Sequence, residues 1–195
     1  TWRDVACRKE TWAFAIAKFL TDPIWWFFLY WTPKYLGSRF GIELAGLAAP
    51  LVAIYIMADF GSIAGGWASA RLISRGSETL AARQRVMLWC AISMLLVIFA
   101  AQTPDLWISV ALVSLATAAH QAWSANLFAT TSDLFAKEEV ASVVGIGGMC
   151  GAIGGMVIAQ VTGLTLHLTG SYTVPFVMSG SAYLVAWGIF RAIVR

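Results

Sequence analysis

The chain has 195 residues, of which 59% are hydrophobic and only 12% are charged, and its net charge is +3. Ordinary soluble domains carry about 25% charged residues, so a water-soluble fold of this length could not cover so much apolar surface. The small and scattered positive charge also argues against a nucleic-acid partner. The composition therefore predicts a membrane protein whose main surroundings are the lipid bilayer.

Six apolar segments are long enough to cross a bilayer, whose hydrocarbon core of about 30 Å requires roughly 20 helical residues. They cover approximately residues 12–36, 44–72, 83–101, 104–127, 140–166 and 172–194. At the start of the fourth segment, Thr103 is expected to cap the helix and Pro104 to occupy its first position. The sequence thus predicts an all-α membrane protein, a single domain of six transmembrane helices over residues 1–195.

The basic residues predict the orientation of these helices. If both termini are cytoplasmic, all thirteen lysine and arginine residues except Lys18, Lys34 and Arg39 lie in cytoplasmic segments, as the positive-inside rule requires. The loop at 38–43 then faces outward. The chain begins with the charged string TWRDVACRKE, without an initiator methionine or a signal peptide, which is the start expected of a cut inside a longer protein.

Cysteine and histidine spacing offers nothing for catalysis or metal binding. Cys7, Cys90 and Cys150 lie far apart, and the two histidines fall in different segments. Neither an HExxH motif nor a nucleophile–base arrangement occurs. We therefore expect no enzyme, no metal site and no resident cofactor.

Small residues recur every four positions in two segments. They are Gly147, Gly151, Gly155, Ala159 and Gly163 in the fifth segment, and Gly61, Gly65 and Ser69 in the second. Such stripes allow two helix backbones to approach closely. They predict tight helix packing, a surface on which helices slide during a conformational cycle, or both.

Polar residues at membrane depth are costly unless they are paired or hydrated, so they mark candidate sites. Asp59 lies near the middle of the second segment and shares a helix face with Tyr55, Ser62 and Gly66. Two interpretations remain open for Asp59: a site residue that exchanges protons, and a structural hydrogen bond to a neighbouring helix.

Lys18 and Asp22 are four residues apart in the first segment, a spacing that allows an ion pair on one helix face. Pro23 follows directly and removes a backbone donor, which predicts a kink. The pair either stabilises this kink or acts in transport, with Lys18 attracting an anionic substrate or Asp22 relaying a proton.

The string HQAWSAN in the fourth segment places His120, Trp123 and Asn126 at steps of three. An aromatic face that stacks on C–H groups, next to an imidazole and an amide that bind hydroxyls, suits a polyhydroxylated ligand. The alternative is that these residues only pack between helices.

Taken together, these features resemble the C-terminal half, spans seven to twelve, of a major facilitator superfamily transporter. The turn from Gly66 to Arg71 and Arg75 is similar to the second copy of the superfamily's conformational loop motif. Ala70 replaces the acidic residue of that motif, which leaves the motif's gating ion pair without one partner.

The strings KFLTDPIWWFFLYWTPKYL, IYIMADFGSIAGGW and WSANLFATTSDLF are similar to hexuronate transporters of the anion:cation symporter family. The resemblance implies proton-coupled uptake of glucuronate or galacturonate across a bacterial inner membrane. It places the site between this chain and a missing N-terminal six-span half. The matching positions are Trp26, Tyr30, Tyr55, Asp59, His120, Trp123, Asn126, Gly147 and Gly148. A glycine at 148 is expected to leave room for a pyranose ring.

Two alternatives to a hexuronate symporter half remain. One is a transporter of another organic or sugar-acid anion. The other is a freestanding six-span carrier that works as a homodimer.

Overall fold

A computed structural model describes residues 2–194, and every regular element in that range is helical. The α-helices are α1 (Trp2–Cys7), α2 (Lys9–Phe40), α3 (Ala48–Ser74), α4 (Thr79–Met94), α5 (Leu106–Leu134), α6 (Lys137–Thr169) and α7 (Thr173–Ile193). Two short 3-10 helices accompany them: η1 (Leu44–Leu47) leads into α3, and η2 (Leu95–Phe99) continues α4.

The predicted number of six helices is corrected to seven α-helices within residues 2–194, because the charged N-terminal string forms the separate short helix α1. Five segments are long and apolar enough to cross a membrane: Leu44–Ser74, Thr79–Phe99, Leu106–Leu134, Lys137–Thr169 and Thr173–Ile193. The sixth long helix, α2, is not in this set. It combines charged residues with Trp and Tyr, whose rings are only partly apolar.

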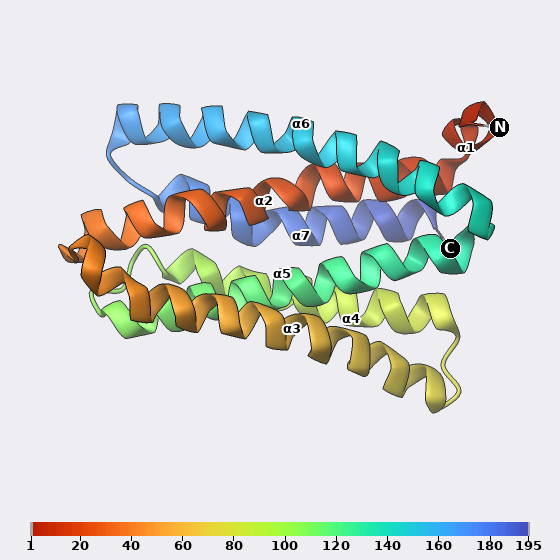
Figure 1. The fold of residues 1–195 in the computed structure, drawn as a ribbon, viewed down its shortest axis with the longest axis horizontal. Coiled ribbons are helices and arrows are strands. Elements are labelled where there is room, and N and C mark those ends of the chain that lie inside the picture. The colour runs from red at the N-terminus through yellow and green to blue at the C-terminus, as the bar shows by residue number, and fades with distance from the viewer. Residues whose placement is uncertain (1, 195) are drawn as a thin grey trace.

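The long helices lie side by side as antiparallel neighbours along the chain (Figure 1). The most extensive contacts are those of α3 with α5 and of α2 with α6, and α4 packs against both α5 and α7. α2 also contacts α5 and α7, so the long helix that is missing from the set of apolar spans packs against three other long helices. Both ends of the described chain lie at the same end of the bundle (Figure 1), as an even number of long helices requires.

The start of α5 differs from the prediction. Asp105 caps the helix, and its Oδ1 accepts a hydrogen bond of 2.9 Å from the backbone N–H of Ile108. Thr103 lies in the preceding turn, where its hydroxyl accepts from the N–H of Asp105 at 3.2 Å. Aspartate is at least as good an N-cap as threonine, so the helix begins two residues after the predicted position.

Small residues form the contact between α3 and α5, which confirms the prediction of tight packing. Gly61, Gly65 and Ser69 are all buried. A Cβ atom on Gly65 would lie 2.5 Å from the Cα of Ala122, so the two backbones meet without an intervening side chain.

The stripe on α6 is used only in part. Gly147, Gly151 and Gly155 face α2, whereas a Cβ on Gly163 would meet no atom within 4 Å. The predicted contact surface therefore ends before Gly163.

Gly154 of α6 lies outside the predicted stripe and packs against Phe19 and Pro23 of α2. Pro23 has no N–H, so the carbonyl of Phe19 loses its helical partner. A glycine at 154 is the only residue that admits both this carbonyl and the proline ring, because any Cβ there would clash with the Phe19 oxygen. α2 is helical throughout Lys9–Phe40 despite Pro23 and Pro33.

Cysteine accessibility tests the orientation in the membrane. Cys7 and Ser38 are both exposed and lie towards opposite ends of α2. We expect an impermeant maleimide applied to intact cells to label a cysteine introduced at Ser38 and to leave Cys7 unmodified until the cells are opened. Rapid labelling of Cys7 in intact cells would reverse the predicted orientation.

Candidate functional site

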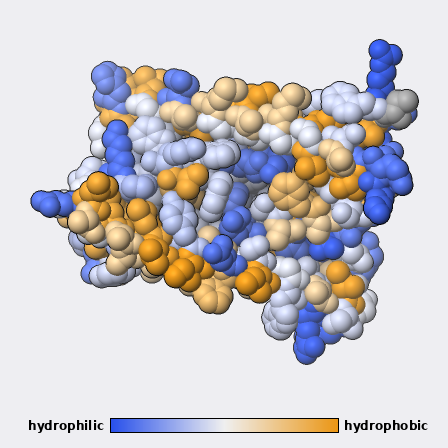
Figure 2. Space-filling model, in the orientation of Figure 1, coloured by the Kyte–Doolittle hydropathy of each residue, from blue (hydrophilic) through white to orange (hydrophobic). Residues whose placement is uncertain are grey.

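One broad face of the bundle is formed by α2, α3, α5 and α6, while α4 and α7 lie behind it (Figure 1). Figure 2 shows this face with hydrophilic side chains along its middle, over α2 and α5, and hydrophobic patches along its edges, over α3 and α6. A face in lipid would show no such polar centre, because unpaired polar groups are costly there. This face, called the polar face below, is therefore the candidate site surface.

α2 contributes a stripe of four candidate site residues, Lys18, Asp22, Trp26 and Tyr30, each one helical turn from the next. The predicted ion pair is confirmed, with 2.6 Å between Lys18 Nζ and Asp22 Oδ2. The rings of Trp26 and Tyr30 stack with their centroids 5.8 Å apart and their planes 9° apart. Tyr30 is 67% exposed. The stripe thus runs from a buried charge pair to an open aromatic surface.

The aromatic end of this stripe borders a pocket between α2 and α6. Trp26 and Tyr30 form one wall, and Gly155 and Met156 belong to the other, around a volume of about 330 Å³. Gly155 creates part of this space, because a Cβ there would lie 2.8 Å from the Trp26 ring.

Two neighbouring helices enclose the charged end of the stripe. The Lys18 ammonium lies 4.3 Å from the centre of the Phe128 ring of α5, close enough for a cation–π interaction. On α6, Gly151 lies against the Asp22 carboxylate, and Gly147 lies against Phe14 and the Lys18 stem. Larger residues at either glycine would displace the ion pair.

Gly148, in contrast, faces away from α2. It is exposed, and a Cβ there would meet nothing within 4 Å. Of the two adjacent glycines predicted for the substrate site, Gly147 packs between helices and Gly148 lies on an open surface.

α3 presents Tyr55, Asp59 and Gly66 at the surface, with Tyr55 half-buried and the other two exposed. Within residues 2–194, Asp59 forms neither an ion pair nor a hydrogen bond through its side chain. The structural alternative for Asp59, a hydrogen bond to a neighbouring helix of this chain, is therefore not found.

The row on α5 does not face an open cavity, contrary to the prediction. His120, Trp123 and Asn126 are all buried, and Trp123 is fully inaccessible. Residues three apart on a helix turn by about 60° per step, so three of them span about 120°, and here they meet different helices. Trp123 packs edge-on against Tyr183 of α7, whereas Asn126 donates to the carbonyl of Gly65 on α3 at 3.0 Å.

His120 forms a second layer behind α2. The ring of Trp25 stacks on it with 5.1 Å between centroids, and its Nδ1 contacts the hydroxyl of Tyr183. That hydroxyl also lies 3.3 Å from the carbonyl oxygen of Thr21. Tyr183 belongs to no motif, and the only sequence signal for it is a tyrosine within an apolar segment.

Gly66, Arg71 and Arg75, the predicted loop motif, are all exposed around the end of α3. Neither arginine forms an ion pair in the part of the chain that the structure describes, in agreement with Ala70 at the acidic position. Other residues make the ion pairs at this end of the bundle: Arg83 pairs with Asp133, and Arg8 pairs with Glu139 at 3.2 Å.

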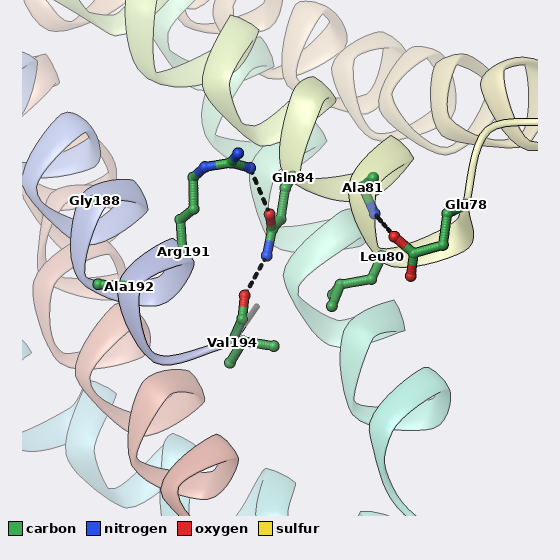
Figure 3. Close-up of a pocket in the computed structure, with 8 residues that line it drawn as sticks. All are labelled: Glu78, Leu80, Ala81, Gln84, Gly188, Arg191, Ala192 and Val194. Atoms are coloured by element: carbon green, nitrogen blue, oxygen red, sulfur yellow. Dashed lines mark hydrogen bonds between the residues drawn. The ribbon is translucent and has the colours of Figure 1, made fainter.

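A second pocket lies between the ends of α4 and α7, away from the polar face (Figure 3). Gln84 donates to the carbonyl of Val194 at 2.8 Å and accepts from Arg191 at 3.0 Å, so its amide joins α4 to the end of α7. Glu78 accepts from the N–H of Ala81 as the cap of α4. These polar groups already have protein partners, and we do not place the site here.

Comparison with known proteins identifies the family. Residues 1–159 match the model of the Major Facilitator Superfamily. The chain belongs to this superfamily. It is a multi-pass membrane protein of a transporter family and not an enzyme.

Named relatives are similar over nearly the whole chain. The Hexuronate transporter of Escherichia coli (strain K12) is 27% identical over 188 residues, which cover 94% of this chain and 43% of the relative. The Hexuronate transporter of Bacillus subtilis (strain 168) is 26% identical over 175 residues, which cover 88% of this chain and 42% of the relative. The chain therefore spans less than half the length of these relatives.

Burial of Trp123 gives a prediction about stability. Trp123→Ala leaves a large cavity beside Tyr183 and should lower the free energy of unfolding by about 3–5 kcal/mol, which a thermal unfolding curve in detergent would report. Trp107→Ala, on the same helix but 57% exposed, is the matched control and should change little. Equal stability of the two variants would show that Trp123 is not a core residue.

Proposed function

We propose that this chain is one half of a secondary active transporter that carries a hexuronate, such as glucuronate or galacturonate, together with protons by alternating access. An N-terminal six-span half completes it, and the substrate binds between the halves. The transporter lies in a bacterial inner membrane, with both termini of this segment in the cytoplasm. The named hexuronate transporters among its relatives support this proposal.

The observation that carries the proposal is the α2 stripe. Sugar rings present C–H groups that stack on aromatic faces, and the stacked Trp26–Tyr30 pair offers such a surface. The adjoining pocket of about 330 Å³ is in the range of small-molecule sites. The charged residues Lys18 and Asp22 lie within about two turns of Trp26 on the same helix face. A ligand with a sugar ring and a carboxylate could therefore contact the aromatic rings with one part and the charged residues with the other.

Other residues take supporting roles in this proposal. In this proposal Tyr55 and the exposed Gly148 contribute to the substrate site, where Gly148 leaves space for a pyranose ring. Asp59 and Asp22 are the candidates for proton coupling. His120, Trp123 and Asn126 form the layer that fixes the helices behind the substrate, in place of direct contact with the open cavity. No resident cofactor is needed, because the proton is the coupling ion.

Two alternatives make different predictions. A transporter of another sugar acid or organic anion would use the same stripe with a different preference in competition assays. A homodimeric carrier would transport without any other chain.

Trp26→Ala tests the aromatic surface. In the full-length transporter reconstituted into vesicles, an inward proton gradient should drive uptake of labelled glucuronate by the parent protein. The variant should bind glucuronate more weakly by about 1–3 kcal/mol, a 5- to 150-fold rise in Kd, because the stacking surface is lost. Trp89→Ala, exposed on α4, should leave binding within twofold. Equal effects of the two substitutions would contradict the assignment of Trp26.

The chain on its own tests the two-half architecture. A major facilitator site lies at the interface of two halves that rock about it. Reconstituted alone, residues 1–195 should give no proton-driven uptake of glucuronate, and co-expression with the N-terminal half should restore it. Saturable uptake by the chain alone would favour the homodimeric carrier.

A further inference from the structure

We propose that Lys18 is the ligand of the substrate carboxylate, and that a proton on Asp22 releases Lys18 for this task. This proposal rests on the proposed function, and it assigns the coupling of proton and anion to a single ion pair within this half. In the unloaded state Lys18 binds Asp22. In the loaded state Asp22 is protonated, and Lys18 binds the carboxylate of the sugar acid instead.

The geometry allows this exchange of partners. The two side chains are 8% and 19% exposed, so the pair lies at the edge of the interior with the carboxylate on the more open side. Only one oxygen of Asp22, Oδ2, is in the ion pair at 2.6 Å. The Lys18 ammonium has three N–H donors. The Phe128 ring beside it is not a conventional hydrogen-bond acceptor, so this contact does not occupy a donor as a carboxylate oxygen would. Lys18 therefore has donors left for an incoming carboxylate.

The Trp26–Tyr30 surface fixes where that carboxylate would lie. Trp26 is one turn beyond Asp22 on the same face, and one helical turn is about 5.4 Å. A hexuronate stacked on these rings can direct its carboxylate along the stripe towards the charged pair. The Lys18 ammonium reaches this level, because its Nζ lies 2.6 Å from Asp22 Oδ2, so one ligand of the size of a sugar acid can contact both parts of the stripe.

Charge balance favours the exchange. The unloaded pair is neutral, and adding an anion alone would leave two carboxylates sharing one ammonium, with both side chains of the pair less than one-fifth exposed. Such an excess charge is strongly unfavourable in an apolar environment. One proton taken from solvent by the Asp22 carboxylate restores neutrality. The balance is therefore one proton and one anion bound together, without any redox or covalent step.

Within residues 2–194, Lys18 is the ion-pair partner of Asp22. The titratable groups that α5 and α7 place behind α2 are His120 and Tyr183, and these two contact each other. α6 presents Gly147 and Gly151 at this level. Asp59 is a further carboxylate on the open face, but it belongs to α3, whose main contact is with α5. Lys18 and Asp22 are therefore the charges that a bound anion meets first on α2.

The experiment measures glucuronate binding as a function of pH, with the purified full-length transporter in detergent. In the parent protein, linkage to one proton should weaken binding as the pH rises, by up to tenfold per pH unit. Binding should take up a proton, which a pH indicator detects in weakly buffered solution. Glucuronamide, in which a neutral amide replaces the carboxylate, should bind without proton uptake.

Asp22→Asn mimics the protonated carboxylate. This variant should bind glucuronate with no proton uptake and with an affinity that no longer depends on pH, and it should retain counterflow while losing accumulation driven by a proton gradient. Asp105→Asn is the matched control, because asparagine caps a helix as well as aspartate does and Asp105 is the N-cap of α5, outside the stripe on α2. It should behave like the parent protein.

Lys18→Met, combined with Asp22→Asn to avoid an unpaired buried charge, tests the ligand itself. The double variant should lose at least tenfold in affinity for glucuronate but keep its affinity for glucuronamide. A parent-like pH dependence and parent-like proton uptake in Asp22→Asn would overturn the proposal, and so would parent-like glucuronate affinity in the double variant. Failure of the parent protein to take up glucuronate would instead contradict the proposed function, so the two failures are distinguishable.

Discussion

The ion pair between Lys18 and Asp22 can exist at membrane depth because other helices surround the helix that carries it. Charged groups in hydrocarbon are stable only when they face a partner, a cavity or the interior of a bundle. α2 meets this requirement by packing against α5, α6 and α7 at once. The five apolar spans can then consist mainly of hydrophobic residues, while the buried ion pair is confined to α2.

The ion pair and the aromatic stack on α2 also require that α6 approaches α2 closely. The glycines of α6 remove the side chains that would otherwise fill the space of the ion pair, of the Trp26 ring and of the carbonyl freed by Pro23. A proline in the middle of a long helix leaves an unpaired carbonyl, and Gly154 brings a backbone directly beside it. Each of these glycines of α6 therefore leaves space for a particular group of α2, and the two helix surfaces are complementary along this part of the contact.

Local periodicity predicted much of this arrangement. Long apolar segments located the ends of most helices to within about four residues, although α5 continues to Leu134, beyond the predicted end at 127. The spacing of Lys18 and Asp22 predicted their pairing, because residues four apart always lie on one helix face. Properties that depend on other helices were not predictable in the same way. The burial of Trp123 and Asn126 depends on α7 and α3, which are distant in the sequence, and nothing near these residues specifies those partners.

The sequence also could not distinguish the two uses of a glycine. Gly147 and Gly148 are adjacent in the chain, yet one packs on α2 and the other lies at the surface, because consecutive helical residues differ by about 100°. The same holds for Trp25 and Trp26, of which one covers His120 and the other borders the pocket. Their roles follow from the rotation of each helix about its own axis, which only the packed structure fixes.

The alignment of four side chains along α2 also restricts how this segment can change in evolution. Replacing one residue of the stripe alters one contact and leaves the rest in place. Inserting or deleting a single residue between Asp22 and Trp26 would turn the aromatic rings by about 100° relative to the charges, although the hydropathy of the segment would hardly change. Substitutions in this helix can therefore change which substrate is preferred, whereas an insertion or deletion between Lys18 and Tyr30 would destroy the alignment of the four side chains.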